Sequence, residues 1–285
     1  MDQKFINLFD RFTHGAMNRR TFMEKLTILA GGTTAANALL PLLENNYARA
    51  DILPEGDPRI VSQTLEYAGG AGYLARPSAE GKYPGVIVIH ENRGLNPHIK
   101  DVTRRMVVEG FAALAPDYLV DLGGTPEDAD KARDMIGTLK PESIAATSSS
   151  ALAALKANPA CNGKAGAMGF CWGGGWVNAL AVADQGLGAG VAYYGLQPPA
   201  ADVAKITAPL LLHYASLDER IDAGIPAFEA ALKAGNKTYE LYMYEGANHA
   251  FNNDTNAARY NKQAADLAWS RTVAFLKKHV SQGVN

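Results

Sequence analysis

A cysteine stands where a glycine-rich turn can present it as a nucleophile. Residues 169–175 read Gly-Phe-Cys-Trp-Gly-Gly-Gly, between an apolar run and a helix-like pattern. This is the G-x-nucleophile-x-G spacing of a sharp strand-to-helix turn, on which the side chain of Cys171 would stand free above a sheet. The helix N-terminus would lower the pKa of the thiol and favour thiolate. The alternatives are a buried cysteine or a phosphate-binding loop, although the lysine and Ser/Thr of a P-loop are absent.

A cysteine nucleophile requires a base, and the base requires an acid that orients it. Asp218 and His249 each follow a short apolar run, at the strand ends where open α/β sheets present functional side chains. The chain order nucleophile, acid, histidine is that of α/β hydrolases. An aspartate after a strand can also be a turn former or helix cap, and a histidine can simply be buried. His90 and His213 belong to predicted strands and fit the role of base less well.

Strand-like and helix-like segments alternate from residue 52 onward. We predict strands over 86–90, 112–115, 165–170, 189–194, 210–214 and 239–244, and helices over 99–107, 125–139, 143–157, 173–183, 225–234 and 257–279. Such alternation predicts an α/β-hydrolase fold, with a mostly parallel sheet covered by helices on both faces, in one domain over residues 51–285. The composition, 47% hydrophobic and 20% charged, is that of a globular protein.

Charge and cysteine content argue against several classes of partner. A formal net charge of -2 gives no field that would attract nucleic acid or an anionic membrane. The two cysteines, Cys161 and Cys171, form no CxxC pair and belong to no zinc-type cluster, so we expect neither a metal nor an organic cofactor. A thiol redox pair is an alternative, but the intervening strand would span about 17–20 Å, which is beyond disulfide reach.

The first 50 residues have the features of an export leader. Arg19 and Arg20 precede a moderately apolar run over 26–43, and Ala48-Arg49-Ala50 suits a signal peptidase. The segment resembles a twin-arginine signal, although Lys25 lies one position later than usual. An ordinary amphipathic helix is the alternative.

This reading predicts where the protein works. The apolar run is too short and too weakly apolar for a stable membrane span. We expect the mature chain to begin near Asp51 and to reach the periplasm through the twin-arginine export machinery. A cytoplasmic protein is the alternative, and the oligomeric state cannot be inferred from the sequence.

Taken together, the motifs resemble the dienelactone hydrolase family over roughly residues 60–279. The resemblance rests on the Cys171 turn, the following Asp218 and His249, Glu91 just after an early strand, and Val-Ala-Tyr-Tyr-Gly at 191–195. It implies that Cys171 attacks a carbonyl carbon and forms a thioester, while His249, held by Asp218, moves the proton. It also implies that Glu91 contacts the resting thiol, and that the backbone N–H groups of Trp172 and Asn92 form an oxyanion hole.

One departure concerns the substrate. Family members that act on dienelactones have an arginine soon after the histidine, which helps to bind the lactone carboxylate; here Asn252 and Asn253 occupy that stretch. Arg93 could supply another guanidinium for the substrate, or pair with Glu91. The resemblance therefore implies hydrolysis of a small ester or lactone more firmly than it implies a dienelactone. A non-catalytic binding or sensor protein on the same fold is the alternative.

Aromatic residues near the predicted turn are candidates for the pocket wall. These are Trp172, Trp176, Tyr118 and Tyr194. Aromatic side chains in such places also serve as core residues.

The leader hypothesis predicts that replacing Arg19 and Arg20 with lysine keeps the protein in the cytoplasm. Fractionation of cells expressing the wild-type and doubly substituted chains measures this. Unchanged recovery from the periplasm would contradict the hypothesis.

Overall fold

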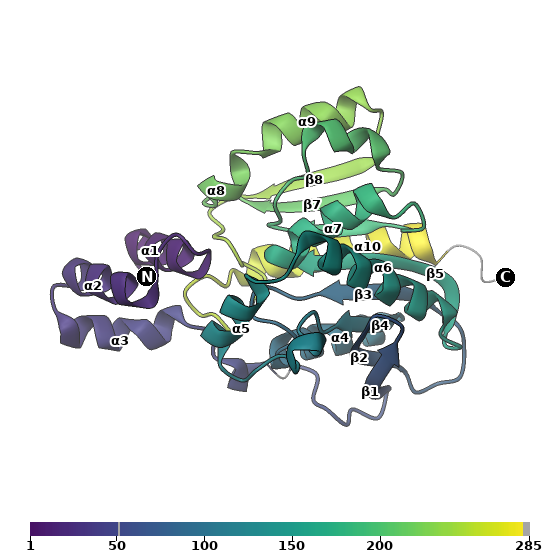
Figure 1. Cartoon of the computed structure of the whole chain (residues 1–285), viewed down its shortest axis with the longest axis horizontal. Coiled ribbons are helices and arrows are strands. Elements are labelled where there is room, and N and C mark those ends of the chain that lie inside the picture. Colours follow the sequence, from purple (N-terminus) through teal and green to yellow (C-terminus); the bar gives the residue numbers. More distant parts are fainter. Residues whose placement is uncertain (51, 282–285) are drawn as a thin grey trace.

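The computed structural model, which describes residues 1–50 and 52–281, is built around an eight-stranded sheet (Figure 1). The strand order is β1-β2-β4-β3-β5-β6-β7-β8. Strands β3 to β8 pair in parallel, whereas β2 runs antiparallel to both of its neighbours. The strands are β1 (Ile60–Tyr67), β2 (Gly70–Pro77), β3 (Tyr83–Ile89), β4 (Ala112–Pro116), β5 (Cys161–Phe170), β6 (Gly190–Tyr193), β7 (Leu210–Ala215) and β8 (Tyr239–Tyr244).

Helices cover both faces of this sheet, and each face has its own hydrophobic core. On one face pack α4 (Pro97–Val108) and α10 (Lys262–Val280); on the other pack α6 (Pro141–Ala157), α7 (Trp172–Ala183) and α9 (Ile225–Ala234). The shorter elements are α5 (Ala129–Ile136), α8 (Glu219–Asp222) and the 3-10 turns η1 (Tyr47–Arg49), η2 (Val120–Leu122) and η3 (Ala200–Lys205). The predicted α/β-hydrolase fold is confirmed.

The helix predicted over 125–139 begins later, at Ala129, and ends at Ile136. Thr125 does not cap it, because its hydroxyl donates to Asp117 Oδ1 at 2.9 Å and accepts from the N–H of Leu95 at 2.9 Å. Asp128 is the cap instead and accepts from the first backbone N–H groups of the helix.

The C-terminal helix also begins later than predicted, at Lys262 rather than 257. The residues before it form turns. The side chain of Asn256 there donates to the carbonyl of Leu43 at 2.7 Å, a partner more than 200 positions away. A contact of that range leaves no periodic signal in the sequence.

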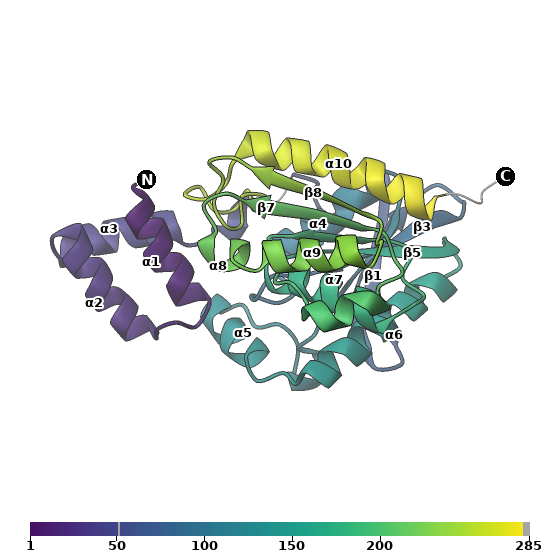
Figure 2. The same ribbon diagram turned by 90° about the horizontal axis from the view of Figure 1, so that it is seen from above.

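Three further helices, α1 (Gln3–Thr13), α2 (Arg19–Ala30) and α3 (Thr33–Leu43), lie together beside α5 and α8 (Figures 1 and 2). They share a small core of buried Leu8, Phe9, Phe12, Phe22, Leu26, Ala36 and Leu43. The apolar run of the predicted leader is therefore divided into α2 and α3, which are bent by 114°. No single helix among the described residues is long and apolar enough to cross a membrane.

The turn between β5 and α7 has a strained backbone. Cys171 adopts φ 56° and ψ -114°, a region that non-glycine residues rarely occupy. A Cβ at Gly173 would lie 2.4 Å from the carbonyl oxygens of both Ile89 and His90, and one at Gly169 would lie 2.3 Å from the carbonyl oxygen of Gly173. Both glycines are required because backbone of β3 and α7 occupies the space of a side chain.

We expect Gly173→Ala to destabilise the fold by about 1–3 kcal/mol, as overpacking against rigid backbone does. Gly175→Ala is the matched control on the same helix, since its Cβ would meet nothing closer than 3.4 Å. There the gain in helix propensity, about 0.5–1 kcal/mol, should hold or raise stability. Thermal unfolding of both variants measures the difference, and equal behaviour would contradict the packing argument.

Candidate active site

The thiol of Cys171 lies beside two imidazoles. His14 Nε2 is 3.2 Å from Cys171 Sγ, and the three ligand-type atoms of His14, Cys171 and His249 all lie within 4.8 Å of one another. The two imidazole rings meet edge to face with centroids 4.7 Å apart. Cys171 is buried, with 8% of its surface exposed. Thiolate and imidazole are also ligands of zinc. Among the described residues, these three side chains form the one group of His, Cys, Asp or Glu whose spacing could hold a metal ion.

His249 is held on its other side by Asp218. Its Nδ1 lies 2.5 Å from Asp218 Oδ2, and both side chains are buried. Asp218 also caps the short helix α8, because its side chain accepts from the N–H of Ile221. The two readings of this aspartate, helix cap and orienting acid, are therefore compatible. His249 Nε2 has no hydrogen-bond partner among the described residues. This nitrogen is therefore free to exchange a proton with a group bound next to Cys171.

The charges around the thiol favour a thiolate facing an imidazolium. Burial raises the pKa of Cys171, but the positive charges of His249 and His14 outweigh burial and lower it to about 6. Burial lowers the pKa of His249, yet the carboxylate of Asp218 and the thiolate raise it well above its ordinary value. The pKa of His14 is raised in the same way, against burial, by Cys171 and Asp10.

Glu91 lies in the site but is held by a residue other than Cys171. Its Oε2 accepts from Asn253 Nδ2 at 2.8 Å, and its Oε1 is buried without a hydrogen-bond partner among the described residues. Asn253, which stands where the family resemblance leads one to expect an arginine, thus fixes this carboxylate. The contact to the resting thiol that the resemblance assigns to Glu91 is made here by His14.

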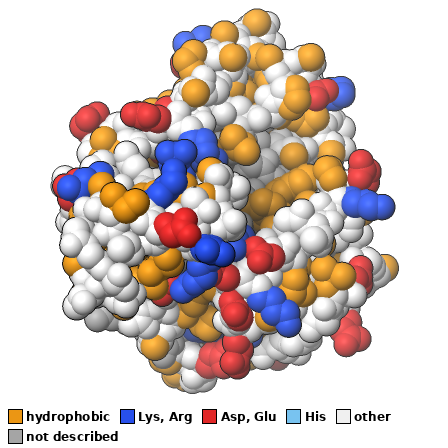
Figure 3. Space-filling model, turned by 60° about the vertical axis from the view of Figure 1, so that its left-hand side comes forward, with side chains coloured by type: hydrophobic (Ala, Val, Ile, Leu, Met, Phe, Trp, Pro, Cys, Tyr) orange, Lys and Arg blue, Asp and Glu red, His pale blue; other side chains and the backbone are white. Residues whose placement is uncertain are grey.

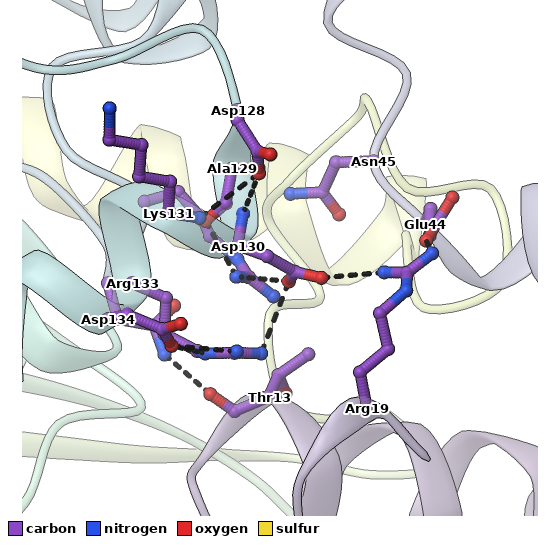
Figure 4. A network of polar contacts seen from close by, with 12 residues as sticks. Thr13, Arg19, Glu44, Asn45, Asp128, Ala129, Asp130, Lys131, Arg133 and Asp134 are labelled. Atoms are coloured by element: carbon purple, nitrogen blue, oxygen red, sulfur yellow. Dashed lines mark hydrogen bonds and ion pairs between the residues drawn. The ribbon is translucent and has the colours of Figure 1, made fainter. Parts of the chain in front are cut away.

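Arg93 does not pair with Glu91. Its guanidinium donates to the carbonyl of Ala129 at 2.8 Å and to Asp130 at 3.0 Å. Asp130 also binds Arg19 at 2.6 Å and Arg133 at 3.2 Å, so one carboxylate joins three guanidinium groups (Figure 4). The alternative of an Arg93–Glu91 pair is therefore wrong, although both side chains line the same cavity.

The two predicted backbone donors lie beside the thiol. Trp172 is the first residue of α7, where helix N–H groups have no partner within the helix. Asn92 follows β3 and lines the cavities together with Cys171. The side chain of Asn92 donates to the carbonyl of Thr13 at 2.8 Å, which orients the loop that carries its backbone N–H.

Two cavities meet at Cys171. The smaller, about 310 Å³, is lined by many polar and charged residues, among them Glu91, Arg93, Arg259 and Tyr47. Burial, followed by the charge of Glu91, raises the pKa of Tyr47 to about 12, so this phenol stays neutral. The larger cavity, about 870 Å³, has an apolar wall of Trp172, Trp176, Val182, Tyr194, Leu196 and Pro198. Figure 3 shows a hollow with hydrophobic side chains beside clustered charged groups on this side of the molecule.

Several sequence candidates lie outside the reacting centre. His90 stacks on Trp172 at 5.2 Å, and His213 contacts Thr272 and Tyr244 in the core. Tyr118, expected in the pocket wall, is buried instead, with its hydroxyl bound to Ser148. Cys161 is a free buried thiol at the opposite end of β5 from Cys171, and Cys171 is free as well, so the alternative of a bridge between them is wrong.

Sequence reasoning missed His14 and Arg259. His14 lies within the predicted leader, a segment whose composition indicates targeting and not catalysis. Arg259 lies ten positions after His249, within a predicted helix. Its guanidinium lines the smaller cavity, and its Nε is buried without a hydrogen-bond partner among the described residues. The sequence does contain one indication of His14: Asp10 lies four residues before it, a spacing that places the acid and the imidazole on one face of a helix.

The chain is similar to curated proteins over about three quarters of its length. Over 226 residues, the chain is 33% identical to the "Probable 2-oxo-3-(5-oxofuran-2-ylidene)propanoate lactonase" of a Bradyrhizobium species, covering 73% of this chain and 89% of that protein. Over 242 residues, it is 32% identical to the "Putative carboxymethylenebutenolidase" of Saccharolobus solfataricus, covering 72% of this chain and 93% of that protein.

A solved structure and a family model also match this chain. The fold matches the crystal structure of a dienelactone hydrolase-like promiscuous phosphotriesterase from metagenomic libraries, with a TM-score of 0.69, 25% identity, and coverage of 78% of this chain and 99% of that one. The model of the dienelactone hydrolase family matches residues 71–280. With the elbow cysteine, the histidine and the acid brought together at the strand ends, this match shows that the chain belongs to the dienelactone hydrolase family.

Proposed function

We propose that the protein hydrolyses a small carboxylic ester or lactone through a thioester on Cys171, with His249 and Asp218 completing a triad. The observation that carries the proposal is the free thiol on the strained turn, beside a buried imidazole that a carboxylate orients, where two cavities meet. A binding or sensor protein would have no need of the strained backbone at Cys171.

In the first half of the reaction, the Cys171 thiolate attacks the carbonyl carbon and a C–S bond forms. The charge that develops on the carbonyl oxygen would be met by the backbone N–H groups of Asn92 and Trp172, a contribution of about 3–4 kcal/mol per donor in related sites. The C–O bond then breaks, and the His249 imidazolium gives its proton to the departing alkoxide. The alcohol of an ester leaves, whereas that of a lactone stays attached to the acyl chain, and in both cases the acyl group remains on sulfur.

In the second half, neutral His249 takes a proton from water as the oxygen of that water attacks the thioester carbon. The C–S bond breaks, the acid leaves, and the thiolate faces the imidazolium again. Asp218 holds the ring in one orientation throughout and stabilises its positive form. The sum is one ester and one water converted to one acid and one alcohol.

The two cavities suggest how the substrate lies. The smaller, polar cavity suits an acyl part that bears a carboxylate or another acceptor group, and the larger, apolar cavity suits a bulkier hydrocarbon part. Within the polar cavity, Arg259 is better placed than Arg93 to bind an anion. The guanidinium of Arg93 is already bound to Asp130 and to the carbonyl of Ala129, whereas the carboxylate paired with Arg259, that of Asp10, lies 3.9 Å away.

The thioester mechanism predicts that iodoacetamide labels Cys171 and abolishes hydrolysis of p-nitrophenyl acetate in step. Labelling should be half-maximal near pH 6 and level above pH 7, because the thiol is protonated below its pKa and ionised above it. The ionisable groups around this thiol are His14, His249, Glu91 and Tyr194, and Asp10, Asp218 and Asp222 lie behind the two imidazoles. Peptide mass mapping across pH 4–10 measures the profile.

Cys161 is the internal control, because burial raises its pKa and its labelling should need a higher pH. Cys171→Ala should lose ester turnover altogether while keeping the fold. Persistent hydrolysis by that variant, or by fully labelled enzyme, would overturn the mechanism and favour a binding protein.

A comparison of two arginine variants tests the placement of the acyl part. We expect Arg259→Gln to raise KM for a carboxylate-bearing lactone by about tenfold or more, the value of one lost charge-assisted contact, and to leave KM for a neutral ester nearly unchanged. Arg93→Gln should affect both substrates alike, through the loop that it holds. Steady-state kinetics on the two substrates measures this, and a selective effect of Arg93→Gln alone would reverse the assignment.

A further inference from the structure

The three N-terminal helices, residues 3–43, cover the active site. We call these residues the cap. We propose that the cap is a resident part of the working enzyme and supplies His14 as a second imidazole to Cys171, an inference that rests on the proposed thioester function. The family match begins at residue 71, so this residue comes from outside it.

The cap is folded as a unit. Phe12 and Phe22 stack with ring centroids 4.5 Å apart, and Phe9 meets Phe22 edge to face at 5.9 Å. Asn18 caps α2 through the N–H of Thr21. Aromatic packing and helix caps of this kind specify a defined structure, whereas an export signal needs only a charged, an apolar and a cleavable region.

Specific contacts join the cap to the hydrolase domain near each end. Thr13 at the end of α1 accepts from Asn92, and Leu43 at the end of α3 accepts from Asn256. Next to the cap, the N–H of Asn46 donates to the carbonyl of Thr255 at 2.8 Å. These are backbone positions, so they fix where the helices lie and not only how side chains meet.

Charged groups add to this interface. Arg19, half of the presumed twin-arginine motif, binds Asp130 on α5 (Figure 4). The guanidinium of Arg133 lies over the ring of Phe12 at 4.8 Å, and that of Arg259 lies over Phe9 at 5.3 Å. A cation over an aromatic face is attracted to it, so the hydrolase domain contributes residues that match the aromatic face of α1.

The position of His14 is set by the end of α1. Its Nδ1 lies 2.8 Å from the carbonyl oxygen of Asp10 and 3.2 Å from the Asp10 carboxylate. Nδ1 therefore carries a proton, and Nε2 faces Cys171 Sγ. An imidazolium at a helix C-terminus is further stabilised by the helix dipole. Protonated His14 would donate one hydrogen bond to Asp10 and one to the thiolate.

This arrangement divides the work between two histidines. His249 gives and takes the protons of the reaction, as described above, while His14 keeps its proton and holds the thiolate between turnovers. In this chain His14 thus occupies the place that the family resemblance gives to Glu91. Thr13 and His14 also line both cavities, so the cap separates the polar space from the apolar space at the sulfur.

The test replaces His14 in the full-length chain with Gln, which can donate a hydrogen bond but carries no charge. We expect the pH of half-maximal Cys171 labelling to rise by about one pH unit or more, the effect of losing a nearby positive charge. A rise of one unit from a pKa of about 6 lowers the ionised fraction of the thiol about fivefold at pH 6 and about twofold at pH 7. Hydrolysis should fall by about these factors or more, and the loss should shrink toward pH 9, where the thiol is ionised in both proteins. A purely structural role would reduce activity equally at every pH.

Lys25→Gln, an exposed charge change on α2, is the matched control and should leave both profiles unchanged. His14→Gln with a wild-type labelling profile would overturn the assignment. Thermal unfolding of both variants shows whether the cap stays folded; if His14→Gln unfolds it, His14→Asn gives the same comparison with a shorter side chain. The proposed function fails separately, through retained hydrolysis by Cys171→Ala.

The intact mass of the protein from its native source tests whether the cap stays on the enzyme. The full chain is expected. A chain that begins near Asp51, which itself lies outside the described residues, would show that the segment is a removed leader and would overturn the cap proposal. In the structure Ala50 is buried and follows a 3-10 turn, so the predicted cleavage site is not presented as an open strand.

Discussion

The strained turn at Cys171 depends on close contact between two backbones. Gly173 packs directly against the last carbonyl groups of β3, with no room for a side chain between them. Because β3 ends there, the chain that follows it begins beside the nucleophile, and Glu91 and Asn92 line the same cavity as Cys171. The same contact sets the direction of α7, whose first N–H groups face the site. One steric constraint therefore positions the nucleophile, the predicted oxyanion donors and the neighbouring carboxylate.

The site that results is buried and charged, a combination that is costly unless each charge has a partner. Asp218 pairs with His249, and Asp10 pairs with His14, so each imidazole next to the thiol has its own acid. Asn253 gives Glu91 one neutral donor. The other carboxylate oxygen of Glu91 is buried without a hydrogen-bond partner among the described residues. A donor group of a bound substrate or water in the cavity would satisfy it. Arg259 shares the carboxylate of Asp10 with His14 and lies 3.9 Å from it.

The parts of the structure that follow from local pattern were predictable, and the parts that follow from distant contacts were not. The elbow around Cys171 and the strand ends before Asp218 and His249 are short motifs. Each depends on the sterics of one turn or the apolar pattern of one strand, which a few neighbouring residues determine. Asn253 was noted only as the absence of an arginine, since its bond to Glu91 spans 162 positions. His14 was hidden for another reason: its segment has the composition of a leader, and composition says nothing about where a helix docks.

The docking of that segment also determines what encloses the site. The cap meets the hydrolase domain through hydrogen bonds, two cation–π contacts and ion pairs of Arg19 and Asp10, while most of its buried apolar residues face one another. Interfaces of this polar kind are typical of parts that move relative to one another, because separating them exposes little hydrophobic surface. The core of the cap lies within the cap itself, so its position over the site depends on these polar contacts. Because Thr13 and His14 line both cavities, the contact that holds the thiolate depends on the cap being in place.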